Sequence, residues 1–433
     1  MKKIINLPVI LLLMVVVFLS SCKKEYGNLN SPTIEDYLKN ASKDQLNGLV
    51  TGTLSGMRIN EGLYLDAVGV MGREMYRFSN ADPRYVTELL GSAPLNNTGF
   101  YITNPWSSRY RTVKNCNVLI DAATNSTLIS DAERKGYLGF SKTMKAYELL
   151  LNVNLTYTNG VRIDVSDAAN LGPILDYDAS IAAMASLLDE AQSDLSGASV
   201  VFVLSPGFAG FTDAAGFTKF NRALAARVAV YREQWSDALT DLNASFFDLN
   251  GDFSTGVSEV FSTGAGDQLN PAYFPQNQNG EVRLGHPSYE ADIEEGDDRI
   301  NKTTLRTTAS SNAGLSSDRD IWVYTSSTAD IPVIRNEELI LIYAEANIQT
   351  SNFDEAVKAL NIVRSGHSLE DYSGAETKDA LTDEMLIQRR YSLFFEGHRW
   401  IDMRRYNKLG ELPIDRAGDQ VWSALPIPLT EGE

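Results

Sequence analysis

The chain of 433 residues has little cysteine and histidine, the residues that most often build disulfides, nucleophiles and metal sites. Its two cysteines are Cys22 and Cys116, and Cys22 ends an N-terminal apolar stretch. Cys116 is then without a partner for an internal disulfide, so the fold must be stabilised by packing. Apolar residues recur at helical spacing around Cys116, which indicates a buried structural thiol. The three histidines, His286, His367 and His398, show no paired metal-ligand spacing, so a histidine zinc site has no support.

Positive charge is also scarce, with 38 Lys and Arg against 56 Asp and Glu and a formal net charge of −18 at pH 7. An acidic body is repelled by phosphates and by anionic lipid surfaces, which argues against nucleic acid as a partner. Common catalytic motifs are missing as well. There is no Walker loop, no Gly-x-Ser-x-Gly elbow and no His-Glu-x-x-His pair, and Gly264-Ala265-Gly266 lacks the third glycine of a dinucleotide fingerprint. No arrangement of residues in the sequence therefore specifies catalysis or a bound cofactor.

One cluster of acids, Glu294, Glu295, Asp297 and Asp298, has the charge to attract calcium. It lacks the ligand spacing of a calcium loop, and a solvated acidic turn is the simpler interpretation. Metal binding stays an open question. A glycosidase pair also stays open, because carboxylates are plentiful and such a pair depends on a separation in space that sequence does not give.

The only long apolar run lies at the N-terminus, from Val9 to Leu19, and follows Lys2 and Lys3. A helix that crosses a membrane needs about 20 apolar residues, so this run is too short. A basic start, an apolar middle and a small-residue end are typical of a cleaved export signal.

The end of that run, Leu19-Ser20-Ser21-Cys22, resembles the bacterial lipobox, in which the cysteine is acylated and becomes the first residue. We expect residues 1–21 to be a lipoprotein signal peptide and Cys22 to carry the lipid. Several acyl chains on one cysteine would give stable anchoring. The polar residues 22–30 would then form a lipidated tether between the membrane and the body of the protein.

Helical periodicity dominates from the tether to about Gly197, and a second helical block runs from Lys219 to Phe247. The clearest helices before Gly197 are predicted at residues 45–57, 105–123, 131–154 and 177–195.

Two stretches, residues 226–239 and 344–357, share small residues and one aromatic, Trp235 or Phe353, at matching offsets. Each predicts a helix, a tight turn and a second helix that packs back through alanines. This is tetratricopeptide-like geometry. The two units are far apart with irregular sequence between them, so a regular repeat array is not expected.

Two regions lack helical periodicity and are expected to be mostly loop: Asn250 to Ile331, and Tyr76 to Asn104. Both carry large aromatic side chains among Gly, Ser, Thr, Asn and Asp. Aromatic rings stack on the C–H faces of sugars, while carboxylate, amide and guanidinium groups bind sugar hydroxyls. These loops therefore indicate carbohydrate binding, although a peptide-binding surface would have a similar composition.

The most specific internal sequence is Phe394-Phe395-Glu396-Gly397-His398-Arg399-Trp400-Ile401-Asp402-Met403-Arg404-Arg405. It predicts a helix that is interrupted at Gly397 and followed by an arginine-rich turn. We expect Arg399, Arg404 and Arg405, beside Glu396 and Asp402, to form ion pairs that lock this segment onto the helical core.

This segment closely resembles the Phe-Glu-Gly-x-Arg-Trp-x-Asp-x-Arg-Arg signature of the SusD/RagB family of outer-membrane nutrient-binding lipoproteins. Four other stretches are similar to family motifs: the helical hairpin at 335–364, the acid-arginine step Asp298-Arg299, the closing Pro426-Ile427-Pro428, and an early helix with Trp106, Tyr110 and Asn117. The resemblance covers nearly all of the chain after the signal. It is stronger after Asn250 than before it.

Membership would imply a mostly α fold of tetratricopeptide-like helical hairpins, a SusD-like α/α superhelix, with an irregular loop-rich ligand-binding half. It would place residues 31–250 in an N-terminal helical region and residues 251–433 in a C-terminal SusD/RagB region, packed together as one unit. It would also imply a lipid anchor in the outer membrane, facing the cell exterior, and a SusC-like TonB-dependent transporter as partner, over which the protein acts as a lid.

The resemblance implies no enzymatic activity and no cofactor, and the expected function is capture of an oligosaccharide ligand and its delivery to that transporter. Peptide capture by the same architecture, a surface glycosidase and a scaffold without its own ligand are the alternatives. From their position in or near the irregular loops, the candidate ligand contacts are Asp66, Arg73, Tyr76, Arg77, Tyr101, Trp106, Tyr273, Tyr289, Trp322 and Tyr324.

Overall fold

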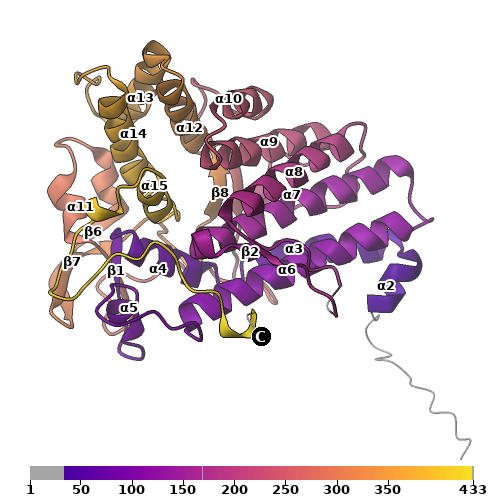
Figure 1. The fold of residues 1–433 in the computed structure, drawn as a ribbon, viewed down its shortest axis with the longest axis horizontal. Helices are drawn as coiled ribbons and strands as arrows, with labels where there is room; N and C mark the ends of the chain where they lie inside the picture. The colour runs from indigo at the N-terminus through magenta and orange to yellow at the C-terminus, as the bar shows by residue number, and fades with distance from the viewer. Residues whose placement is uncertain (1–33, 168, 432–433) are drawn as a thin grey trace, which may run out of the picture.

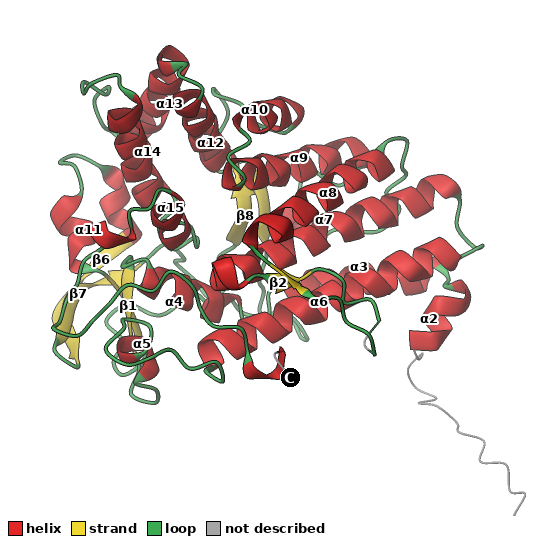
Figure 2. Cartoon of the chain, in the orientation of Figure 1, coloured by secondary structure: helices red, strands yellow, loops and turns green. Residues whose placement is uncertain are grey.

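The computed structural model describes residues 34–167 and 169–431, and these are mostly α-helical, as predicted (Figures 1 and 2). The predicted signal peptide, the lipidation site Cys22 and the tether lie outside the described residues. Within those ranges, every helix is too short or too polar to cross a membrane.

The first part of the chain forms a layer of long helices that pack against their neighbours in sequence, from α6 to α7, α8 and α9 (Figure 1). The helices of this part are α2 (Ile34–Asn40), α3 (Lys43–Met57), α4 (Glu61–Met71), α5 (Arg84–Thr87), α6 (Phe100–Asn125), α7 (Asp131–Thr156) and α8 (Tyr177–Leu195). Three of the four predicted helices agree with the structure to within two residues at each end. The fourth, α6, begins at Phe100 and runs through Pro105, where the sequence predicted its start.

Side-chain caps explain where these helices begin. The side chains of Ser42 and Ser130 each accept a hydrogen bond from the backbone N–H three residues on. The side chains of Gln45 and Glu133 in turn accept a hydrogen bond from the backbone N–H of the cap residue. These capping boxes satisfy backbone N–H groups that have no partner inside the helix. Asp176 caps α8 in the same way by accepting from the N–H of Ala179.

The two predicted hairpins are confirmed as α9 (Ala214–Tyr231) with α10 (Trp235–Ala244), and α12 (Asn336–Gln349) with α13 (Phe353–Gly366). Each turn contains a residue other than glycine with a positive φ, Glu233 at 57° and Ser351 at 63°. Ala238 and Ala356 are fully buried between the paired helices. Their small side chains let the helices approach closely, as the pattern predicted.

The region from Asn250 to Ile331 is mostly loop, as predicted, but the strands that it contains were not predicted. It holds the strands β4 (Gly256–Glu259), β5 (Val282–Gly285), β6 (Thr303–Asn312) and β7 (Leu315–Ile321), and β8 (Ile331–Arg335) follows. The strand β6 is largely exposed, so it carries little of the apolar alternation that marks a half-buried strand. Ala313 and Gly314 both have positive φ and close the tight β6–β7 hairpin.

The main sheet joins segments from distant parts of the chain, in the order β1-β5-β7-β6, and every pairing is antiparallel. β1 (Met75–Phe78) belongs to the region 76–104 that was expected to be irregular, and it pairs with β5. The pairing brings together strands more than two hundred residues apart. The main hydrophobic core likewise runs from Ala41 to Leu425, and therefore includes residues of both predicted regions.

The signature segment lies in the turn after α14 (Lys378–Ser392) and in α15 (Arg399–Arg405), and Gly397 turns the chain between the two helices with φ 87°. Asp402 accepts hydrogen bonds from Arg389 Nε at 2.7 Å and Arg405 at 3.0 Å. Arg405 also binds Glu345 of α12 at 2.7 Å. The predicted locking of this segment by ion pairs is thus seen for Arg405 and Asp402.

The other charged residues of the segment have different partners from those expected. The guanidinium of Arg404 donates to the backbone carbonyls of Ser423 and Asn154, and Glu396 pairs with Arg335. Burial lowers the pKa of His398 to about 4, so this histidine is neutral inside the fold. Cys116 is buried as predicted, and burial raises its thiol pKa to about 12.

Replacing Asp402 with alanine would leave two buried arginines short of a carboxylate partner. We expect Asp402→Ala to lower the free energy of unfolding by about 3–5 kcal/mol, the usual cost of breaking a buried ion pair. The matched control is Asp383→Ala, which removes an exposed aspartate that pairs with Lys408 and should cost less than about 1 kcal/mol. Urea denaturation measures the free energy of unfolding of both variants. Equal decreases would contradict the prediction that the buried ion pairs of Asp402 stabilise the fold more than an exposed pair does.

Candidate ligand-binding site

The structure separates the ten predicted ligand contacts into two groups by exposure. Eight of them are buried: Asp66, Arg73, Tyr76, Arg77, Tyr101, Trp106, Tyr289 and Tyr324. Only Tyr273 and Trp322 are partly exposed.

The charged members of the buried group hold the fold together. Asp66 accepts two hydrogen bonds from Arg283 of β5, at 2.6 and 2.9 Å. Arg77 pairs with Glu281 at 2.6 Å, and its guanidinium lies 4.9 Å from the ring centre of Tyr85. Arg73 donates to four backbone carbonyls, so each of its three guanidinium nitrogens has an internal partner. In this structure the charged groups of Asp66, Arg73 and Arg77 therefore bind other protein groups and do not face a ligand.

The buried aromatic members also have internal roles. The hydroxyl of Tyr289 donates to the carbonyl of Arg299 at 2.8 Å, and that of Tyr324 donates to the carbonyl of Phe395 at 3.2 Å. Tyr101 donates to Glu88, and Trp106 packs against Tyr110 within α6. Tyr76 contacts the ring edge of His286. None of these five side chains reaches the surface.

Tyr273 and Trp322 lie together with their ring centres 6.1 Å apart. Trp322 lines an open pocket of about 590 Å³, and Phe253 is a second aromatic residue in its lining. The pocket lies between the β7–β8 connection, the start of α12, the C-terminal end of α13 and the turn after α14. Its polar lining residues are Asp252, Ser254, Asp298, Arg299, Asn301, Lys302, Arg335, Glu337, His367 and Glu396.

Charged groups form the floor of this pocket. Arg335 binds both Glu396, at 3.0 Å, and Glu337. Lys302 donates to the carbonyl of Ser392 and lies 4.0 Å from Glu396. Burial lowers the pKa of Lys302 to about 8. Burial would by itself raise the pKa of Glu337, but Arg335 and His367 outweigh it and hold that pKa below its usual range.

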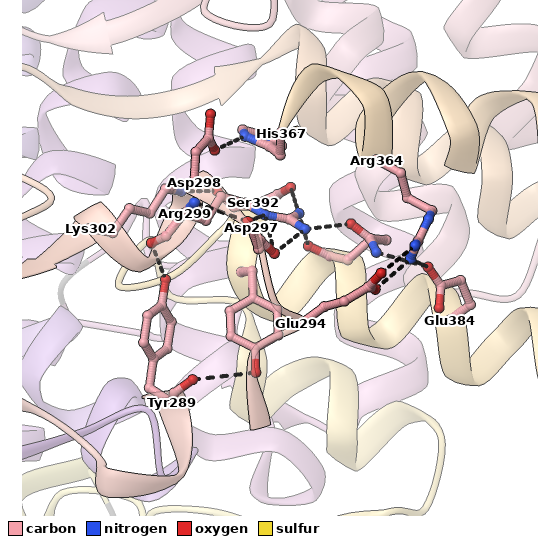
Figure 3. A network of polar contacts seen from close by, with 12 residues as sticks. Tyr289, Glu294, Asp297, Asp298, Arg299, Lys302, Arg364, His367, Glu384 and Ser392 are labelled. Carbon is pink, nitrogen blue, oxygen red and sulfur yellow. Dashed lines mark hydrogen bonds and ion pairs between the residues drawn. The ribbon is translucent and has the colours of Figure 1, made fainter. Parts of the chain in front are cut away.

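The wall of the pocket beside His367 is fixed by the polar network of Figure 3. His367 bridges two acids, Asp298 at 2.9 Å from Nδ1 and Glu337 at 2.6 Å from Nε2. Next to it, Arg299 is held by Asp297 at 2.7 Å and by the hydroxyl of Ser392 at 2.9 Å. The wall is therefore tied directly to α14.

The acidic cluster considered for calcium is divided among basic partners in the same network (Figure 3). Asp297 pairs with Arg299, Asp298 with His367, and Glu294 with Arg364. In the ranges that the structure describes, no set of three or more His, Cys, Asp or Glu side chains is arranged to hold a metal ion.

Several residues of the pocket were not among the predicted contacts, above all Phe253, Asn301, Lys302 and His367. Asn301 and Lys302 lie two and three residues after Arg299 of the acid-arginine step, so that motif marks the pocket in the sequence. Phe253 and His367 give no such signal, because only the packing of α13 brings them beside Trp322.

The described residues thus form two parts. Helical hairpins make up the frame, and a loop-rich part carries an open pocket. Residues 268–423 match the family model described as the SusD family. A SusD-like protein of Formosa agariphila is 33% identical over 91 residues, and this aligned part is 19% of the present chain and 18% of that relative. These matches confirm the resemblance to the SusD family that was recognised from the sequence, and they lie in the C-terminal part of the chain.

Solved structures share the whole fold. A SusD superfamily protein from Parabacteroides distasonis has a TM-score of 0.68 at 17% identity, covering 91% of this chain and 97% of that one. Surface glycan-binding protein A from Bacteroides thetaiotaomicron, in complex with laminarihexaose, has a TM-score of 0.69 at 15% identity, covering 90% and 97%. NanU of B. fragilis has a TM-score of 0.66 at 15% identity. At these identities the likeness concerns the fold.

The contrast between buried and exposed tyrosines is open to a direct test. Replacing Tyr289 with phenylalanine removes a buried hydrogen bond, so we expect the free energy of unfolding to fall by about 1 kcal/mol. Tyr273→Phe is the matched control, because its hydroxyl has no hydrogen-bond partner among the described residues, and it should leave stability unchanged. Denaturant titration of both variants gives the comparison. If Tyr289→Phe were also neutral, the internal role assigned to that hydroxyl would be wrong.

Proposed function

We propose that this protein is a cell-surface glycan-binding lipoprotein that captures an oligosaccharide and delivers it to a SusC-like TonB-dependent transporter, over which it acts as a lid. The observation that carries the proposal is the partly exposed Trp322, set beside a charged and hydrogen-bonding pocket floor in a SusD-like fold.

The chemistry of the pocket suits a sugar. Trp322 and Phe253 offer apolar ring surface for the C–H faces of a pyranose ring, and Tyr273 extends that surface beyond the pocket. Asn301 and Asp298 are exposed at its edge and provide amide and carboxylate groups for hydroxyls. An aromatic platform beside a polar rim binds the two kinds of surface that a sugar presents.

The pocket supports binding over hydrolysis. A glycosidase needs one carboxyl group with a raised pKa to act as a general acid. In this pocket Glu337 and Glu396 are both paired with Arg335, and the pKa of Glu337 is lowered. Glu337 is therefore not suited to donate a proton to a glycosidic oxygen.

The surface location rests on the lipobox-like sequence that ends at Cys22 and on the family likeness. The polar residues 22–30 would let the body move relative to its lipid anchor, as a lid over a transporter requires. The acidic charge of the chain disfavours direct attachment to anionic lipid, so the anchor would be the covalent lipid.

Removing the ring of Trp322 should weaken glycan binding. We expect Trp322→Ala to lower the affinity for a bound oligosaccharide by about tenfold or more, which corresponds to roughly 1.4 kcal/mol, and Trp322→Phe to restore most of it. Isothermal titration calorimetry against a panel of neutral oligosaccharides, laminarihexaose included, measures this.

Two controls accompany that titration. Tyr372→Ala removes another partly buried aromatic that does not line the pocket, and it should leave affinity unchanged. A reducing-end assay on the same glycans should show no turnover. Unchanged affinity in Trp322→Ala would refute the site, and steady release of reducing ends by the pure protein would refute the assignment as a binder.

The anchor can be tested separately at Cys22. We expect Cys22→Ala to abolish incorporation of labelled fatty acid and to shift the protein out of the outer-membrane fraction, because no thiol remains at the lipobox. Cys116→Ala is the matched control, and its lipidation and location should be those of the unchanged chain. If Cys22→Ala stayed in the outer-membrane fraction without incorporating labelled fatty acid, the lipid on Cys22 would not be the anchor.

A further inference from the structure

A second and larger cavity lies in the helical part of the molecule, away from Trp322 and its strands. Its volume is about 850 Å³, within the size range of pockets that hold small ligands. It is formed by the start of α8, the α9–α10 turn and the ends of α12, α14 and α15, elements that can be followed in Figure 1. The lining residues are Tyr157, Tyr177, Asp178, Ile181, Ala182, Val230, Tyr231, Arg232, Glu233, Trp235, Gln349, Lys378, Arg405, Tyr406 and Asn407.

Four aromatic side chains in this lining are only partly buried: Tyr157, Tyr177, Trp235 and Tyr406. They come from four separate segments and share one concave space. Tyr157 and Tyr177 meet edge to face, with ring centres 4.7 Å apart. The loop predictions did not include any of these residues. Such a concentration of partly exposed rings is unusual for a surface that needs no ligand.

Tyr157 is held in this wall at the expense of backbone strain. Its φ of 46° and ψ of −118° lie outside the regions that residues other than glycine prefer. The guanidinium of Arg404 lies 4.1 Å from the centre of its ring and keeps the side chain in place. Strained residues of this kind concentrate at functional sites, where the surrounding structure enforces them.

The cavity also contains buried polar atoms without a protein partner. The hydroxyl of Tyr177 and the Nε of Arg405 are buried, and neither forms a hydrogen bond to another described residue. The side chain of Arg405 is only 7% exposed, and its other nitrogens bind Glu345 and Asp402. An unpaired buried donor is costly, so these two atoms add a second kind of strain to the wall that lies beneath the cavity lining.

The exposed charges at the rim cancel. Asp178 and Glu233 are negative, Arg232 and Lys378 are positive, and none of the four has an ion-pair partner among the described residues. A rim without net charge, on a chain with an overall charge of −18, favours an uncharged ligand over phosphates or other anions.

We propose that this cavity is a second carbohydrate site, which takes a short neutral oligosaccharide by stacking it on Trp235 and Tyr406 and by binding its hydroxyls through the exposed polar groups of the rim. This inference rests on the proposed glycan-binding function and adds a binding position on the helical side. With two separate sites, one molecule can hold two positions along a long glycan, or two shorter chains.

The test is calorimetry of the full-length chain in detergent with laminarihexaose and a panel of other neutral oligosaccharides. The unchanged protein should bind two equivalents of a recognised glycan. Trp235→Ala and Trp322→Ala should each remove one of them, with at least a tenfold loss of affinity at the altered site. Trp235→Phe should restore most of the lost binding, and Tyr372→Ala should retain both sites.

A second pair of substitutions guards against misfolding of Trp235→Ala. Asp178→Ala with Lys378→Ala alters only exposed rim residues that make no ion pair in the described chain, and should weaken the same site several-fold without changing the unfolding temperature. Quenching of tryptophan fluorescence that persists in Trp322→Ala and is lost in Trp235→Ala would locate the second glycan directly.

The outcomes separate the two proposals. One equivalent of glycan that vanishes in Trp322→Ala and is unaffected in Trp235→Ala would overturn the second site and leave the proposed function standing. Absence of binding by every glycan in the unchanged protein would overturn both. Binding of peptides from a casein digest at the Trp235 cavity, with no glycan bound there, would overturn the carbohydrate assignment.

Discussion

The relative placement of the last helices depends on buried charges that cannot exist without partners. Arg405 binds Glu345 and Asp402, and Arg389 binds Asp402. Further along α12, Arg227 of α9 binds Glu338 at 2.6 Å. Removal of a charge from water costs several kcal/mol, so each of these groups is tolerated only where its partner is present. The pairs therefore position α9, α12, α14 and α15 against one another.

Both cavities are built on that frame. Ser392, at the end of α14, accepts a hydrogen bond from Lys302 through its carbonyl, and Glu396 in the following turn binds Arg335 in the floor of the Trp322 pocket. On the other side, Arg405 and Tyr406 at the end of α15 line the cavity of Trp235. One short, charge-rich segment therefore contributes to two surfaces that face different parts of the molecule.

The helices were predictable because their information is local. Capping residues and the 3.6-residue apolar period define α3, α7 and α8 almost to the residue, and the spacing of alanines defines the two hairpins. The sheet was not predicted, because β1 and β5 are short strands from distant parts of the chain. The contacts of the candidate site were only partly predictable. Tyr289 and Trp322 occur in similar polar sequence, yet one ring is buried against Phe394 and the other is partly exposed.

By itself, the sequence determined the helical class of the fold, the hairpins, the structural thiol Cys116 and the resemblance to the SusD family, because each depends on residues that are close together in the chain. Only the tertiary structure decided which aromatic side chains are available to a ligand. Exposure depends on what packs against a ring from distant segments, as α13 does beside Trp322 and α15 beside Trp235. Composition places aromatic residues in the loops, and long-range packing selects the few that remain at a surface.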